Sequence, residues 1–207
     1  MLHWYTADNP FAALVLAHGA GGGQTSPFMV NAGRELAFRG ISTATFDFDY
    51  MAQGRRAPDA APVCERRWRR AIEDARPAAP GLPLFIGGKS FGGRMASHVA
   101  SQGGAGTLAG LVFLGYPLHP PGKPQQRRDA HLPAIPEPML FVQGSRDTFG
   151  TADEIRELLP GLQRATLHEV AEGDHGFKVP KRAGDPSTVM GAILDAVAAW
   201  ARQSAPL

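Results

Sequence analysis

The chain reads Leu84-Phe85-Ile86-Gly87-Gly88-Lys89-Ser90-Phe91-Gly92-Gly93 at its most informative point. The first three residues form a short apolar run that is typical of a buried strand, and helical spacing follows from Arg94 onward. Between the two, the pattern Gly88-x-Ser90-x-Gly92 places a serine at a sharp strand-to-helix turn, where the backbone crowds its own neighbours. Such a turn projects the serine hydroxyl outward, so Ser90 is the first candidate nucleophile.

Apolar runs and segments of helical spacing alternate along the rest of the chain. We expect strands at residues 11–17, 41–48, 84–86, 111–114, 139–142 and 165–170. We expect helices at residues 27–39, 63–79, 94–101, 152–159 and 187–202. Because the strands are apolar on both faces and alternate with helices, the fold class is α/β: a mostly parallel central sheet of about six or seven strands, flanked by helices on both sides.

Length and composition fit one domain over residues 1–207. The chain has 25 glycines and 18 prolines, about one residue in five, which excludes a helical bundle or coiled coil. A hydrophobic content of 43% is enough for a packed core. The one long irregular stretch is residues 116–138, a loop rich in proline and polar residues, and no helical cap is expected there.

Charge and cysteine content point away from several classes of protein. The formal net charge is +2, and the basic cluster Arg66-Arg67-Trp68-Arg69-Arg70 fits a solvated helix face, so we expect no nucleic-acid partner. The apolar run 11–17 is far shorter than the ~20 residues of a membrane helix. The N-terminus lacks the pattern of a signal peptide, and the single Cys64 suits a reducing compartment. We therefore expect a cytoplasmic protein with no membrane partner.

Candidate partners for Ser90 follow the later strands. Gly144-Ser145-Arg146-Asp147 comes after residues 139–142, and Glu172-Gly173-Asp174-His175 comes after residues 165–170. Ligands in open α/β sheets bind beyond the carboxyl ends of the strands, which is where these groups would lie. Asp174 competes with Asp147 as the acid, but an acid directly before the histidine is poorly placed to bond its Nδ1. Serine, acid and then histidine is also the chain order of α/β-hydrolase triads.

With these motifs in this order, the sequence resembles the α/β-hydrolase superfamily, in particular its small capless members near the dienelactone-hydrolase-like and uncharacterised bacterial branches. The resemblance extends from residue 11 to the last helix, although six expected strands are fewer than the family's usual eight. It implies that Ser90 is the nucleophile, His175 the general base and Asp147 the residue that orients the imidazole. Dienelactone hydrolases carry a cysteine where this chain has Ser90, so their substrate is not inherited.

The resemblance also implies an oxyanion hole. Its donors would be the backbone N–H groups of Phe91 and Ala20, with Gly21 as the alternative to Ala20, because His18-Gly19-Ala20-Gly21-Gly22 follows the first buried strand. His18 precedes the serine and breaks triad order, so we expect it to hold this loop. The implied reaction is hydrolysis of a small ester or thioester through an acyl-enzyme, with no cofactor and no metal.

Substrate contacts are expected near the ends of the strands. Without a cap, the site should be shallow and bordered by Tyr116, Phe177 and the loop 116–138. Arg55 and Arg56, in a loop past a strand end, would favour an anionic substrate together with Lys89 and Lys178. The alternative is local pairing of these two arginines with nearby acids, namely Asp47, Asp49 or Asp59.

Other classes of function compete with a hydrolase. Gly88-Lys89-Ser90 is similar to the end of a Walker A loop, but Pro83 stands where that motif needs its first glycine. A dinucleotide fingerprint beginning at Gly19 fails at Gln24, where its third glycine belongs. A non-catalytic interaction module on the same fold, and an acyltransferase that uses the same site, are the alternatives that stay open.

Overall fold

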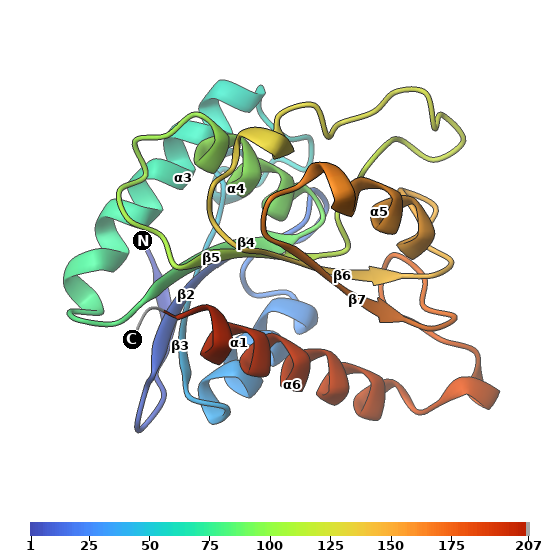
Figure 1. Ribbon diagram of the computed structural model, residues 1–207. Helices are drawn as coiled ribbons and strands as arrows, with labels where there is room; N and C mark the ends of the chain where they lie inside the picture. The colour runs from blue at the N-terminus through green and yellow to red at the C-terminus, as the bar shows by residue number, and fades with distance from the viewer. Residues whose placement is uncertain (206–207) are drawn as a thin grey trace.

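The computed structural model describes residues 1–205 and contains one seven-stranded sheet with the strand order β1-β3-β2-β4-β5-β6-β7 (Figure 1). The strands are β1 (His3–Tyr5), β2 (Ala12–Ala17), β3 (Ile41–Phe46), β4 (Leu84–Lys89), β5 (Gly110–Leu114), β6 (Met139–Gly144) and β7 (Ala165–Val170). Only the pairing of β1 with β3 is antiparallel, and all other neighbours are parallel. The expected mostly parallel sheet is confirmed.

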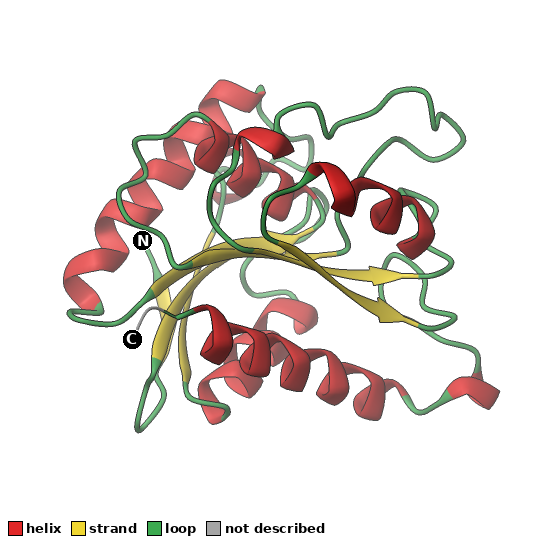
Figure 2. Ribbon diagram, viewed as in Figure 1, coloured by secondary structure: helices red, strands yellow, loops and turns green. Residues whose placement is uncertain are grey.

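Helices cover both faces of this sheet, as Figure 2 shows. The helices α3 (Ala61–Ala75), α4 (Phe91–Ser101) and α5 (Ala152–Leu158) lie on one face, and α1 (Pro27–Phe38) and α6 (Pro186–Ser204) lie on the other. A short helix, α2 (Asp49–Ala52), follows β3. Buried apolar side chains accordingly form two clusters, one on each side of the sheet. The strands are apolar on both faces because each face packs against helices.

Local sequence signals define where the helices begin. Pro27 and Pro186 occupy the first turns of α1 and α6, where the missing N–H of proline costs no helical hydrogen bond. The Asp185 side chain accepts hydrogen bonds from the first backbone N–H groups of α6. Thr151 and Glu154 form a reciprocal capping box at the start of α5.

Several element boundaries differ from the expected ones. The strand β1 escapes prediction because three residues are too few to show an alternating pattern. The strand β4 continues through two glycines to Lys89. At the first of them, Gly87, a Cβ atom would lie 2.0 Å from the carbonyl oxygen of Val112 on the neighbouring strand, so only glycine fits there. The helix α4 begins at Phe91, directly after Ser90, and not at Arg94.

No cap domain is inserted between β5 and β6, in agreement with the sequence analysis. Residues 116–138 between β5 and β6 form an irregular loop in which the one short helical turn within the described chain is Leu132–Ala134. Among the helices of residues 1–205, none is long and apolar enough to cross a membrane.

The register of the parallel strands brings their carboxyl ends together. Lys89 at the end of β4 pairs with Leu114 at the end of β5, and Leu114 pairs in turn with Val142 on β6. Gly144 on β6 pairs with Val170 at the end of β7. The turns that follow β4, β6 and β7 therefore meet at one edge of the sheet, and these turns carry the predicted site residues.

Candidate active site

Three side chains form a continuous hydrogen-bond chain at this edge. Ser90 Oγ lies 2.8 Å from His175 Nε2, and His175 Nδ1 lies 2.7 Å from Asp147 Oδ2. An ionised carboxylate only accepts hydrogen bonds, so Nδ1 carries the proton and Nε2 presents its lone pair to the serine hydroxyl. The structure thus brings together the three residues that the sequence singled out, with His175 between Ser90 and Asp147.

The backbone at Ser90 is held in an unusual conformation. Its φ is 50° and its ψ is −115°, a strained combination for a residue with a side chain. A Cβ atom at Gly88 would lie 2.6 Å from the carbonyl oxygen of Ala17, and one at Gly92 would lie 2.5 Å from the same atom. The flanking glycines therefore let the turn pack against β2, which leaves the serine hydroxyl directed toward His175.

Asp147 is fixed by a hydrogen-bond network within the protein. Its carboxylate is 1% exposed, and it accepts hydrogen bonds from the Phe149 backbone at 2.8 Å and from Gln143 Nε2 at 2.9 Å, in addition to the one from His175. Gln143 Nε2 also donates to the carbonyl oxygen of Gly150 at 2.6 Å. Sequence reasoning missed Gln143, although a lone amide at the end of an apolar strand is a usable signal for a buried polar contact.

Asp174, the alternative to Asp147, forms hydrogen bonds with the backbone and not with the His175 side chain. Asp174 Oδ1 accepts hydrogen bonds from the backbone N–H groups of Gly176 and Lys178, at 2.8 and 2.9 Å. These bonds shape the loop that carries His175, and the imidazole turns away from Asp174 toward Asp147. The choice of Asp147 over Asp174 therefore agrees with the geometry.

Two further residues restrain His175. The Phe149 ring lies 4.3 Å from the imidazole, centroid to centroid. On the other side, Lys89 Nζ donates a hydrogen bond to the His175 backbone carbonyl oxygen. Burial of Lys89 lowers the pKa of its amine to about 8, and the Phe177 ring lies 5.2 Å from the same ammonium group.

The loop after β2 lies beside Ser90 and is fixed by hydrogen bonds to buried side chains. His18 is completely buried; its Nδ1 lies 2.7 Å from the Gly19 carbonyl oxygen, and its Nε2 accepts from the Phe48 backbone N–H at 3.2 Å. Burial also lowers the pKa of His18, so the imidazole is neutral and holds the loop, as the sequence led us to expect. The Tyr50 hydroxyl donates to the Ala20 carbonyl oxygen at 3.0 Å, which fixes the peptide next to Ser90.

Two hollows meet at Ser90, and both are also lined by Ala20 and Phe149. We call the first the histidine hollow; it has a volume of about 560 Å³ and is further lined by Gly19, Gly21, Gly22, Ser26, Phe28, Met29, Lys89, His175, Gly176 and Lys178. We call the second the arginine hollow; it has a volume of about 320 Å³ and is further lined by Pro58, Asp59, Ala61, Phe91, Arg94, Pro117 and Arg128. Both are open to the surface, as expected for a site without a cap.

The three predicted substrate contacts do not line either hollow. Arg55 is exposed and forms an ion pair with Asp59 at 2.7 Å, the local pairing that was the alternative. Tyr116 is buried, and its hydroxyl donates to the Arg128 carbonyl oxygen at 2.8 Å. Phe177 is buried as well, because its side chain packs into the core on the α1 and α6 side of the sheet.

Other residues take the places of these three. Phe28 and Phe149 supply the aromatic surface of the histidine hollow. Phe28 comes from the second residue of α1, and Phe149 from the turn that follows Asp147. Neither position shows a distinctive motif, so neither could be recognised from the sequence.

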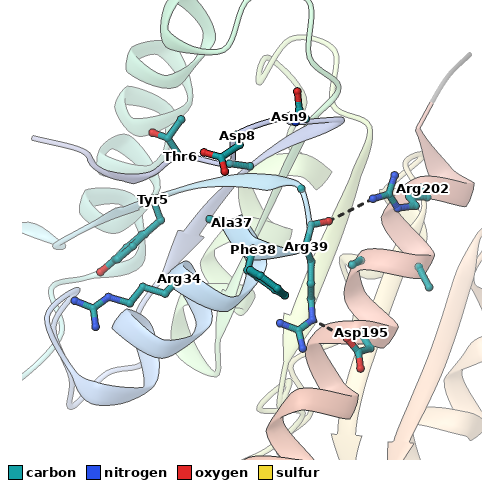
Figure 3. A pocket seen from close by; sticks show the side chains of 14 residues that line it. Tyr5, Thr6, Asp8, Asn9, Arg34, Ala37, Phe38, Arg39, Asp195 and Arg202 are labelled. Atoms are coloured by element: carbon teal, nitrogen blue, oxygen red, sulfur yellow. Dashed lines mark hydrogen bonds and ion pairs between the residues drawn. The ribbon is translucent and has the colours of Figure 1, made fainter.

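A larger hollow, of about 990 Å³, lies at the opposite edge of the sheet (Figure 3). It is formed by residues that precede β2 and β3 and by one side of α6, and two of its arginines form bonds across it. Arg39 Nε pairs with Asp195 at 2.7 Å, and the Arg202 guanidinium reaches the Arg39 carbonyl oxygen. None of Ser90, His175 and Asp147 lines this hollow. The volume of a hollow therefore does not by itself identify the candidate active site.

Comparison with known proteins agrees with this fold. The family model described as an alpha/beta hydrolase domain matches residues 10–202, and the chain belongs to that family.

Solved structures show the same architecture. A dienelactone hydrolase from Anabaena variabilis superposes with a TM-score of 0.75 at 18% identity, over 99% of this chain and 92% of that one. An α/β serine hydrolase without lid from Xanthomonas campestris gives 0.73 at 18%, over 100% and 89%. Est1E from Butyrivibrio proteoclasticus, solved with ferulic acid bound, gives 0.76 at 12%, over 99% and 94%. The resemblance to small capless α/β hydrolases is confirmed.

Proposed function

We propose that the protein is a serine hydrolase that cleaves a small ester or thioester. The observation that carries this proposal is the chain of hydrogen bonds from Ser90 through His175 to Asp147, with 2.8 and 2.7 Å between the bonded atoms. The proton position that this chain requires leaves Nε2 free to act as a base toward the serine hydroxyl. Membership of the α/β hydrolase family supports the same reading.

The first half of the reaction forms an acyl-enzyme. Ser90 Oγ attacks the acyl carbon while His175 Nε2 takes the hydroxyl proton, and Asp147 stabilises the imidazolium without taking a proton itself. The backbone N–H groups of Phe91 and Ala20 stabilise the oxyanion, and a pair of such donors typically lowers the barrier by several kcal/mol. His175 then gives its proton to the leaving oxygen or sulfur atom, and the bond from the acyl carbon to that atom breaks.

Water completes the reaction. His175 takes a proton from a water molecule, the resulting hydroxide attacks the acyl carbon, and Ser90 leaves with that proton restored to its oxygen. The two open hollows, of about 560 and 320 Å³, favour substrates with short groups on both sides of the ester bond. We also propose that residues 1–207 act as one domain in the cytoplasm, where the buried thiol of Cys64 stays reduced.

Covalent labelling tests this proposal. We expect a fluorophosphonate probe to modify the protein at one residue, and mass spectrometry of the digest to place the adduct on Ser90. The Ser90→Ala variant should take up no label. The matched control is Ser97→Ala, because within residues 1–205 Ser97 forms the other close pair of serine and histidine side chains, 2.7 Å from His131 Nε2, but lines neither hollow. A well-folded protein that takes up no label would instead support a non-catalytic interaction module.

A further inference from the structure

Two arginine side chains, Arg94 and Arg128, line the arginine hollow next to Ser90. Within residues 1–205, neither guanidinium group forms an ion pair, and the buried Nε of Arg94 has no hydrogen-bond partner. The neighbouring arginines are different: Arg55 pairs with Asp59 at 2.7 Å, and Arg127 pairs with Asp129 at 2.8 Å. Of these four arginines, the two that form no ion pair are therefore the two that line the hollow.

This arrangement is unfavourable for the isolated protein. Transfer of a guanidinium group into the protein without an acceptor costs free energy, and a second like charge nearby adds to that cost. Both effects lower the pKa of Arg94, burial first and the charge of Arg128 second. The Phe91 ring, 5.5 Å from the Arg94 guanidinium carbon, offsets only part of this cost. Paired cations of this kind are typical of sites that bind an anion.

Backbone hydrogen bonds fix the positions from which both arginine side chains extend. The Arg94 N–H donates to the Ser90 carbonyl oxygen at 3.1 Å, so this arginine lies one helical turn after Ser90. Arg128 is anchored on both sides, because its N–H donates to the Leu118 carbonyl oxygen at 2.9 Å and its own carbonyl oxygen accepts from Tyr116. Asp59 is the acid that lines the hollow, and its charge is balanced by Arg55.

The position of His175 shows which part of an ester would enter this hollow. His175 must protonate the leaving group, so the leaving group lies within reach of Nε2. His175 lines the histidine hollow but does not line the arginine hollow. The leaving group therefore occupies the histidine hollow, and the acyl part extends toward Arg94 and Arg128.

We propose that the arginine hollow binds a carboxylate on the acyl part of the substrate, so that the preferred substrates are half-esters or half-thioesters of dicarboxylic acids. The planar fork of N–H donors on arginine matches the two oxygens of a carboxylate. This inference rests on the proposed hydrolase function and adds the substrate class to it.

Matched ester pairs test the substrate class. We would measure kcat/KM for monoethyl esters of the dicarboxylic acids from succinate to suberate, and for ethyl esters of the corresponding uncharged acids. At least one half-ester should exceed its uncharged partner by about 10–100-fold, the range expected for a charged hydrogen-bonded contact. An acetate ester with its carboxylate on the alcohol part should gain no such advantage. Half-esters that are no better than uncharged esters at every length would overturn the inference.

Substitutions then test the two arginines. Arg94→Gln and Arg128→Gln should each lower the ratio of half-ester to uncharged-ester kcat/KM by about tenfold. Arg127→Gln is the matched control, since this arginine lies in the same loop but pairs with Asp129, and it should keep the ratio of the wild type. Equal losses on both kinds of ester in the first two variants would contradict the assignment. Arg128 is partly exposed in a loop, so its variant remains informative where Arg94→Gln folds poorly.

A binding measurement separates this inference from the proposed function. Titration calorimetry with glutarate, a dicarboxylate that needs no turnover, should detect binding to the wild type and a loss of affinity in both arginine variants. Labelling of Ser90 by the fluorophosphonate together with no glutarate binding and no preference for half-esters would remove the carboxylate site and leave the hydrolase intact. Glutarate binding without labelling of Ser90 would support the carboxylate site and contradict the proposed hydrolase function.

Discussion

Lys89 Nζ donates a hydrogen bond to the backbone carbonyl oxygen of His175, and so connects the residue before the proposed nucleophile to the residue that would act as the base. The bond spans from the end of β4 to the loop after β7, two segments that are not neighbours in the sheet. Because the ammonium group lies beside the Phe177 ring and lines the histidine hollow, its protonation state affects the site directly.

Activity should therefore fall on the alkaline side as Lys89 loses its proton. Burial lowers the pKa of Lys89 to about 8, and above that pH the neutral amine makes a weaker bond to His175. A lowered pKa in the folded state means that this group adds stability as pH rises from about 8 toward the unfolded value, so the loss would not be unfolding. Profiles of kcat against pH, with thermal melts in the same buffers, check both parts.

Lys89→Met should lower kcat by about tenfold at pH 7 and remove the alkaline fall, because small displacements of a catalytic group are costly. Lys178→Met is the control, since Lys178 lines the same hollow but its side chain has no bond to His175. An alkaline fall that persists unchanged in Lys89→Met would assign it to another group.

Asp147→Asn should lower kcat by about 10⁴-fold with little change in melting temperature, because an amide facing His175 favours the wrong imidazole tautomer. Asp174→Asn serves as the control, since an amide oxygen can still accept the two backbone hydrogen bonds that shape the loop. Steady-state kinetics on one short ester would compare the two variants. A similar loss of kcat in Asp147→Asn and Asp174→Asn would contradict the choice of Asp147 over Asp174.

Gly92→Ala should destabilise the fold and not only the site. The new methyl group would lie 2.5 Å from the Ala17 carbonyl oxygen and 2.6 Å from that of His18, and such overpacking costs about 1–3 kcal/mol or more. Gly161→Ala, where no atom beyond the adjacent residues lies within 4 Å of the added carbon, should change the free energy of unfolding by less than about 0.5 kcal/mol. Urea unfolding of both variants tests this contrast, and equal midpoints would contradict it.

His131 should make the protein sensitive to acid. Burial, followed by the charge of His98, lowers the pKa of His131 to about 4, so it is neutral in the folded state and hydrogen-bonded to Ser97. Its contribution to stability is complete above the unfolded pKa of 6.5 and is lost as pH falls through about 4. Allowing for its partial exposure, we expect this loss to be on the order of 1–2 kcal/mol.

Unfolding by urea at pH 7 and pH 4 measures this loss. His131→Gln should show a smaller decrease in stability between the two pH values, whereas the exposed His3→Gln should behave as the wild type does. The same decrease in all three proteins would place the acid sensitivity elsewhere.

The hydrogen-bonded residues of the site could be predicted from sequence because each lies in the turn or loop that follows a strand. Buried strands are recognisable as apolar runs, and the parallel register then brings Ser90, Asp147 and His175 to one edge of the sheet. The loop proposed to form the oxyanion hole, residues 18–22, follows β2 for the same reason. The interpretation of His18 as a support for that loop also agrees with the structure, since a buried imidazole needs hydrogen-bond partners near it.

The expected substrate contacts depended on the directions of side chains, which strand ends do not determine. Tyr116 follows β5 as the others follow their strands, but its backbone N–H bonds to the Gln143 side chain and its ring packs into the core. Arg55 is drawn away by Asp59, four residues further along the chain. The exposure of Arg94 to a hollow depends on residues far apart in the sequence, so neither periodicity nor motif could reveal it.

The loop between β5 and β6 closes at its base, because the Arg128 N–H bonds to the Leu118 carbonyl oxygen at 2.9 Å. Residues 121–127 are exposed beyond that closure, and the entropy of closing a loop rises only slowly with its length. Residues inserted within 121–127 would leave the positions of Tyr116 and Arg128 unchanged. The fold thus contains a place beside the arginine hollow where evolution or protein engineering can lengthen the chain without altering the residues at the carboxyl ends of the strands.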